Sequence, residues 1–230
     1  MSEKRVLLLG IGNVLWADEG FGVRCIEEIH RRYSFPETVT LMDGGTQGIY
    51  LVQHVQSADI LVVFDAIDYH LDDGELLLVE DDDVPNFMGA KKMSLHQTGF
   101  QEVLSTSKLL GDYPEKILLV GVQPVELEDF GGSLRPAVKA QINPAITIVV
   151  DYLEKLGISV HERKEPLPKV ELLSPSELAL EQYEAGRPSE HDACRLGDER
   201  VLLDKKVKFD PKPSPIEQAL SVPVDHRGQY

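Results

Sequence analysis

The stretch VLLLGIGNVLWADEGFGVR, residues 6–24, joins an apolar run to two glycines and two adjacent acidic residues. The apolar run has the length of a buried β-strand, and a helix is predicted over residues 20–33. Gly10 and Gly12 match the start of a dinucleotide-binding fingerprint, but Leu15 replaces its third glycine. Two carboxylates at the start of the helix would also repel a phosphate. The stretch therefore predicts a strand, a tight turn and a helix, and it argues against dinucleotide binding.

The rest of the first 157 residues alternates between strand-like and helical patterns. Further strands are predicted at residues 38–43, 60–66, 74–80 and 116–122, and helices at about 46–56, 94–108 and 136–157. Only about seven residues join the third strand to the fourth, too few for a parallel crossover, so the fourth strand should run antiparallel. We therefore expect an α/β fold of the phosphorylase/hydrolase-like kind. Its sheet would be open, twisted, five-stranded and mostly parallel, with helices on both faces, one antiparallel edge strand and an extended C-terminal tail.

The C-terminal part of the chain has a different composition. Residues after 157 contain eight of the 14 prolines but only three aromatic residues, and they show no sustained periodicity. One short helix is predicted from Pro175, because Ser174 can cap it and proline suits the first helical position. We expect an α/β domain over residues 1–160 and a proline-rich extension over residues 161–230 that is extended or partly disordered.

The charge of the chain restricts its partners. Its 230 residues include 39 acidic and 23 basic ones, which gives a formal net charge of −16. Such a surface disfavours nucleic acid and anionic membranes, and it suits cations or cationic partners. Cys25 and Cys194 lack the spacing of a metal or disulfide framework, and no apolar run is long enough for a signal peptide or a membrane span. We expect a cytoplasmic monomer that binds neither nucleic acid nor membranes.

Three acidic residues are placed where chemistry is possible. Asp18 and Glu19 lie at the predicted start of the first helix, where an ordinary cap needs only one carboxylate. The neighbouring Gly20 and Gly22 form helix poorly but allow close approach to the backbone, so a functional carboxylate is the alternative to a simple cap. Asp65 ends an otherwise apolar strand, where a charge is costly to bury and where open α/β sheets bind ligands. The alternative is that backbone amides satisfy Asp65.

A histidine completes a possible metal site. His96 lies near the start of a predicted helix, whose positive end favours the neutral imidazole that a metal ligand requires. The alternative is an exposed helix residue without a role. Glu19, Asp65 and His96 all follow strands or open helices at one edge of the predicted sheet. Two carboxylates and one imidazole suit a borderline divalent ion and leave coordination positions open. We therefore predict that this edge holds a cation, or a cation carried by a partner.

Five stretches of the sequence, in order, resemble the hydrogenase maturation endopeptidases. They are GIGNVLWADEGFGVR (10–24), DGGTQG (43–48), VVFDAID (62–68), SLHQTG (94–99) and LVGVQP (119–124). The resemblance covers essentially residues 5–157. It implies an aspartic-type endopeptidase that removes the C-terminal extension of the nickel-iron hydrogenase large-subunit precursor once nickel is inserted. The precursor would supply the nickel.

The resemblance also implies which residues act. It assigns metal binding and catalysis to Glu19, Asp65 and His96, and it provides no catalytic serine or cysteine. A metal-polarised carbonyl and a carboxylate-activated water remain alternative routes to hydrolysis. Two other functions are considered: a non-catalytic nickel-recognition checkpoint that uses the same three residues, and a nucleotide-binding or peptidyl-tRNA-binding hydrolase on a similar sheet.

Overall fold

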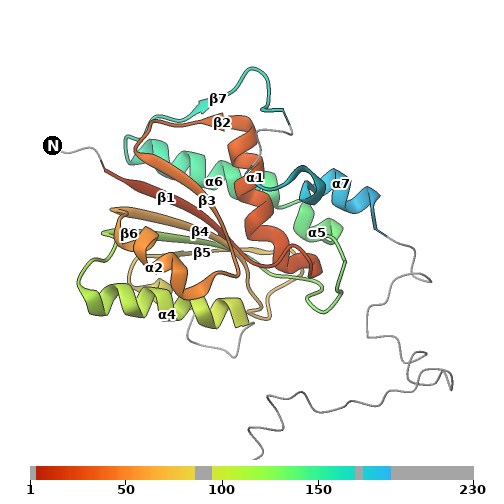
Figure 1. The fold of residues 1–230 in the computed structure, drawn as a ribbon, viewed down its shortest axis with the longest axis horizontal. Helices are drawn as coiled ribbons and strands as arrows, with labels where there is room; N and C mark the ends of the chain where they lie inside the picture. The colour runs from red at the N-terminus through yellow and green to blue at the C-terminus, as the bar shows by residue number, and fades with distance from the viewer. Residues whose placement is uncertain (1–3, 86–94, 169–172, 188–230) are drawn as a thin grey trace, which may run out of the picture. The chain divides into compact units, whose positions relative to one another are not determined.

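The computed structural model describes residues 4–85, 95–168 and 173–187, without the side chains of residues 95–98. The large sheet in these ranges consists of β1 (Val6–Ile11), β3 (Val39–Gly45), β4 (Ile60–Ala66), β5 (Leu76–Glu80) and β6 (Lys116–Val122) (Figure 1). A two-stranded sheet pairs β2 (Tyr33–Ser34) with β7 (His161–Glu162). The helices are η1 (Ala17–Gly20), α1 (Phe21–Arg32), η2 (Gly48–Leu51), α2 (Val52–Gln56), α4 (Leu95–Leu110), α5 (Pro136–Lys139), α6 (Ile142–Lys155), η4 (Ser176–Leu178) and α7 (Leu180–Ala185). None of the helices in the described ranges has the length and apolar character needed to cross a membrane.

The strand order of the large sheet is β3-β1-β4-β6-β5. β1 pairs in parallel with β3 and β4, and β4 pairs in parallel with β6. β5 lies at the edge and pairs with β6 in antiparallel orientation, as its short connection to β4 requires. The predicted α/β fold, with a mostly parallel five-stranded sheet and one antiparallel edge strand, is therefore confirmed.

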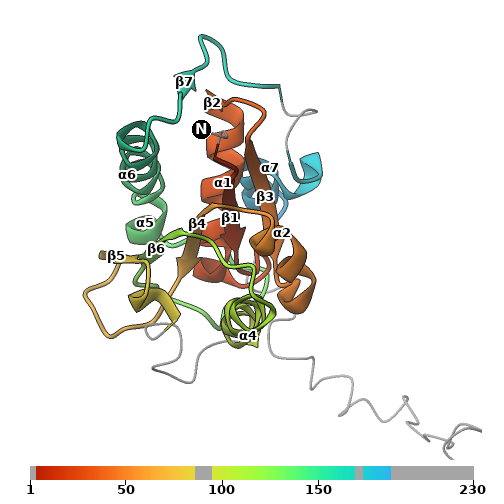
Figure 2. The ribbon, with the colours of Figure 1, turned by 90° about the vertical axis from the view of Figure 1, so that its left-hand side faces the viewer.

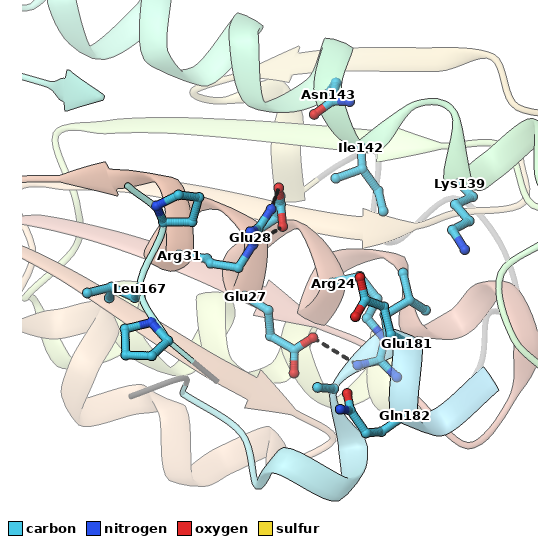
Figure 3. Close-up of a pocket in the computed structure, with 14 residues that line it drawn as sticks. Arg24, Glu27, Glu28, Arg31, Lys139, Ile142, Asn143, Leu167, Glu181 and Gln182 are labelled. Carbon is cyan, nitrogen blue, oxygen red and sulfur yellow. Dashed lines mark hydrogen bonds and ion pairs between the residues drawn. The ribbon is translucent and has the colours of Figure 1, made fainter. Parts of the chain in front are cut away.

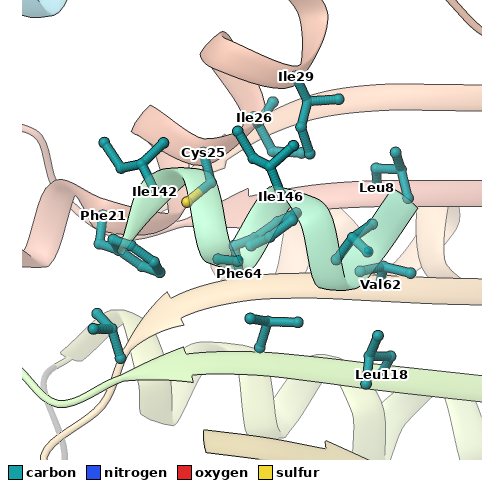
Figure 4. Packing of buried hydrophobic residues seen from close by; sticks show 14 of the residues in the cluster. Leu8, Phe21, Cys25, Ile26, Ile29, Val62, Phe64, Leu118, Ile142 and Ile146 are labelled. Atoms are coloured by element: carbon teal, nitrogen blue, oxygen red, sulfur yellow. The ribbon is translucent and has the colours of Figure 1, made fainter. Parts of the chain in front are cut away.

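Both faces of the sheet are covered, which explains why the inner strands are apolar without interruption. One core lies between the sheet and helices α1 and α6, and a second lies between the sheet and helices α2 and α4 (Figures 1 and 2). Alternate residues of one strand serve the two cores: Leu8 packs in the first, whereas Leu7 and Leu9 pack in the second. Figure 4 shows the first core, in which Phe64 of β4 lies among apolar side chains of α1 and α6.

Glycines allow α1 to approach the sheet closely. A Cβ at Gly22 would overlap the carbonyl oxygens of Phe64 and Ile11, and a Cβ at Gly10 would overlap the carbonyl oxygen of Gly22. The backbone of the first turn of α1 therefore contacts the ends of β1 and β4 directly. This contact brings the turn that precedes α1 to the carboxyl edge of the sheet.

Three helical predictions differ from the structure in detail. The helix predicted at about 46–56 is a 3-10 turn, η2, followed by the short α2. The single helix predicted over residues 136–157 is two helices, α5 and α6, that meet at residues 140–141. Pro144 has no N–H to donate to the carbonyl of Ala140, so the chain begins a new helix whose first turn accommodates the proline. The helix predicted from Pro175 is a 3-10 turn, η4, followed by the short α7.

The described part of the predicted extension lies against the α/β core. β7 pairs with β2, and residues 173–187, which we call the C-terminal strap, carry η4 and α7. Arg24 of α1 donates to the carbonyl of Leu178 and stacks its guanidinium over the ring of Tyr183, 5.6 Å from the ring centroid. Lys139 contacts Glu184 of the strap at 2.8 Å. The domain boundary at residue 160 remains a prediction.

Candidate active site

The turn between β1 and α1 is folded around Gly12. This residue has φ +129°, a conformation that favours glycine, and a Cβ there would overlap the carbonyl oxygen of Glu19. The N–H of Asn13 donates to that same oxygen at 3.1 Å, and the N–H of Gly12 donates to the carbonyl of Gly45 at 3.0 Å. Gly12 therefore allows the backbone of Glu19 to lie close against the turn, and this contact fixes Glu19 beyond the carboxyl end of β1. Glu19 itself is half-buried.

Asp18 does not cap α1, contrary to the simpler expectation from the sequence. Its carboxylate is fully buried and accepts the N–H groups of Val125 and Glu126, both at 2.9 Å, and of Arg135 at 2.6 Å. The N-cap position of α1 is occupied by Gly20, which has no side chain with which to cap the helix. Asp18 thus ties the turn before α1 to the loop that follows β6. In the sequence, the only sign of this role was that two adjacent acids precede a helix that needs one carboxylate as its cap.

Asp65 lies at the carboxyl end of β4 with no exposed surface. Its Oδ1 accepts the N–H of Ala66 at 2.8 Å, so a backbone amide supplies part of its stabilisation, as the alternative interpretation expected. Burial, and secondly the charge of Asp65, raise the pKa of the Tyr69 hydroxyl. The 3-10 turn η1 contacts β4. Glu19 and Asp65 are therefore carried to the same edge by neighbouring segments.

His96 is the second residue of α4, and its side chain lies outside the described residues. The first turns of α4 lie beside the start of η2: a Cβ at Gly99 would be 3.4 Å from the Cα of Gly48. Gly45, the last residue of β3, lies three residues before Gly48, and its carbonyl accepts the N–H of Gly12 in the turn after β1. The backbone thus brings the segments of all three predicted site residues to one edge of the sheet. The roles of Glu19, Asp65 and His96 as metal ligands and catalytic residues stay predictions.

The donor set decides which ion such a site would suit. Two carboxylates and one imidazole fit a borderline divalent ion, and three protein ligands leave positions for a guest. Among the side chains that the structure describes, no three of His, Cys, Asp and Glu are grouped to hold a metal, and the imidazole of His96 is not among those side chains.

Asp43 is a further carboxylate at this edge that the sequence did not single out as a site. Its Oδ1 accepts the N–H of Gly45 at 2.9 Å, and its Oδ2 accepts the hydroxyl of Ser174 from the C-terminal strap at 3.3 Å. Burial raises the pKa of the Asp43 carboxyl, and the two hydrogen bonds oppose that shift. Asp43 therefore orders the carboxyl end of β3 and joins it to the strap.

Cys25 is a core residue, as its position between apolar helix residues predicted. It has no exposed surface and packs in the core between the sheet and α1 (Figure 4). Burial raises the pKa of its thiol well above the usual value, so the nucleophilic thiolate is disfavoured at neutral pH. Cys194 lies outside the described residues.

A cavity of about 490 Å³ lies elsewhere, between α1, the start of α6 and the segments around residues 167 and 180 (Figure 3). Neither Glu19 nor Asp65 lines it. Two ion pairs within α1 hold charged groups at its wall: Arg24 with Glu27 at 2.8 Å, and Arg31 with Glu28 at 2.6 Å. These four charged groups at the cavity wall are therefore already paired with one another.

Comparisons with known proteins agree on one group. A family model described as hydrogenase maturation protease matches residues 23–152. The hydrogenase expression/formation protein HoxM of Azotobacter vinelandii is 57% identical over 210 residues, which cover 91% of this chain and 100% of HoxM. The hydrogenase 2 maturation protease of Escherichia coli is 38% identical over 161 residues, 70% of this chain and 97% of that protein. Among solved structures, the hydrogenase maturating endopeptidase HybD from E. coli has a TM-score of 0.66 at 38% identity, and the match covers 69% of this chain and 98% of HybD.

Proposed function

The chain belongs to the hydrogenase maturation protease family, and from this premise we propose its substrate and its site. The substrate is the nickel-loaded precursor of a nickel-iron hydrogenase large subunit, from which the protein removes the C-terminal extension in the cytoplasm, acting as a monomer. One observation carries the proposal: the turn of Glu19, the strand end of Asp65 and the start of α4 lie at one carboxyl edge of the sheet.

Nickel enters this reaction as part of the substrate. Glu19, Asp65 and His96 dock the ion that the precursor already holds, which places the bond to be cut beside the site. A half-buried Glu19 can reach a guest, and a cation would offset the cost of burying the carboxylate of Asp65. Because no cysteine takes part, the site shares the ion without competing strongly for it.

Hydrolysis then adds a water molecule across the peptide bond. The water oxygen bonds to the carbonyl carbon, the C–N bond breaks, and a proton from the water passes to the leaving nitrogen. In one route a site carboxylate takes that proton from the water and delivers it; in the other, nickel polarises the carbonyl and the water attacks directly.

The deciding experiment incubates nickel-loaded and nickel-free precursor with the protein and measures the shortening of the precursor. We expect the wild type to cleave only the nickel-loaded precursor. His96→Ala and Asp65→Asn should both lose cleavage, and His96→Ala should keep a melting temperature near that of the wild type. The control is His161→Ala, because this exposed histidine lies in β7, on the two-stranded sheet.

The outcomes separate the alternatives. A wild-type protein that binds the loaded precursor without shortening it would be the non-catalytic checkpoint. Near wild-type trimming by His96→Ala would remove His96 from the site. Cleavage of nickel-free precursor at the same rate would remove nickel from recognition.

A further inference from the structure

Two loops that lie against each other at the carboxyl edge expose apolar side chains close in the chain to Glu19. Residues 13–16 come before η1, and residues 125–132 follow β6. Leu15, Val125 and Phe130 are 39%, 43% and 43% exposed, respectively, although each is apolar. We call this surface the apolar platform.

The platform is an ordered structure. Trp16 forms isolated bridges with Phe130 and Gly132, and the N–H of Gly131 donates to the carbonyl of Leu15 at 2.7 Å. The rings of Trp16 and Phe130 pack edge to face with centroids 5.3 Å apart. The exposure of these apolar groups is therefore built into the fold, and exposed apolar groups gathered by ordered loops can serve as an interaction surface.

Asp18 fixes the platform to the candidate site. Its carboxylate holds the N–H groups of Val125 and Glu126, and its own N–H donates to the carbonyl of Glu126 at 3.1 Å. The next residue along the chain is Glu19. A segment that lies on the platform is consequently held in a fixed register to the proposed nickel-docking carboxylate.

The charge around the platform limits what it can bind. Glu128 is exposed and Glu126 is half-buried on the same loop, whereas Arg135 and Arg187 both pair with Asp129, at 2.9 and 2.8 Å. These five groups together carry a formal charge of −1, and the carboxylate of Glu19 lies on the adjoining turn. The whole chain carries −16. An apolar segment with neighbouring lysine or arginine side chains would complement this surface, and an acidic segment would be repelled.

We propose that the apolar platform docks a segment of the hydrogenase large-subunit precursor in which apolar side chains lie next to basic ones. This inference rests on the proposed function, because it identifies how the same site recognises its protein substrate. The platform would contribute to the affinity for the precursor, and the carboxyl-edge residues would carry out cleavage.

The test compares steady-state cleavage of nickel-loaded precursor by the full chain and its variants. The double variant Leu15→Ser/Phe130→Ser should raise KM about tenfold, as expected for loss of apolar contacts at the centre of an interface, with kcat within about twofold of the wild type. Glu128→Gln should raise KM at low salt and weaken the dependence of KM on salt. The matched control is Leu110→Ser, because Leu110 is 61% exposed at the end of α4.

The outcomes are distinguishable from those for the proposed function. If the wild type does not shorten the precursor, the proposed function fails. If the wild type does so and the double variant keeps the wild-type KM at an unchanged melting temperature, the platform proposal alone is overturned. A double variant that changes the oligomeric state in gel filtration but leaves KM unchanged would show that the surface joins copies of this chain, which also overturns the proposal.

Discussion

Replacing Asp18 with alanine should destabilise the fold strongly, although this residue lies in a turn. The carboxylate has no exposed surface and accepts three backbone N–H groups, from Val125, Glu126 and Arg135. A hydrogen bond to a charged group contributes about 1.5–3 kcal/mol, and orphaned donors add a desolvation cost. Water can reach part of the loop after the change, because Val125 is partly exposed. We therefore expect a loss of about 3–5 kcal/mol in the free energy of unfolding, at the upper end for a single substitution.

Urea unfolding followed by circular dichroism measures this loss directly. The control is Asp151→Ala, an exposed acid on α6, which should change the free energy of unfolding by no more than about 0.5 kcal/mol. Asp18→Asn keeps the shape but turns an amide group towards a backbone N–H, so its cost should fall between those of the wild type and Asp18→Ala. If Asp18→Ala unfolds at the same urea concentration as Asp151→Ala, the three hydrogen bonds do not hold the loop and the argument is wrong.

Three further predictions concern other parts of the fold. Gly12→Ala should lower the free energy of unfolding, measured by thermal unfolding, by at least about 2 kcal/mol and by more than Gly157→Ala does. Both residues have positive φ, but of the two only Gly12 lacks room for a Cβ, so equal losses would contradict this explanation. Burial raises the pKa of the folded Asp43 carboxyl, so the wild type loses stability as the pH rises from the usual value of 3.8 through that pKa. Asp43→Asn removes this titration and also gives up one of the two acceptor roles towards Gly45 and Ser174, so its melting temperature relative to the wild type should rise from below pH 3.8 to pH 7. A relative melting temperature that does not rise over this range would refute this. Arg24→Met should cost about 3–5 kcal/mol by denaturant unfolding, since it leaves buried Glu27 without its partner, and Arg24→Met/Glu27→Leu should recover most of that loss if pairing is the cause.

Much of the fold was predictable because its signals are local. Buried strands such as β4 are continuous apolar runs, and the short connection to β5 forces the antiparallel edge. Asp65 could be identified as an unusual residue because an acid at the end of such a strand is costly to bury. The two helices in place of one at residues 136–157 were missed, although Pro144 was the local signal for the break.

The sequence alone determined the order of strands and helices, the antiparallel edge strand and the candidate acids at the carboxyl edge, because each depends on residues close together in the chain. Only the tertiary structure decided the roles of Asp18 and Arg24. The partners of Asp18 are 107 to 117 residues away, and the carbonyl that Arg24 binds is 154 residues away. A buried charge must find donors or acceptors wherever the fold brings them, and the sequence around Asp18 is equally compatible with an ordinary helix cap. The role of such a residue is therefore fixed by which distant segments meet, and that is a property of the packed chain.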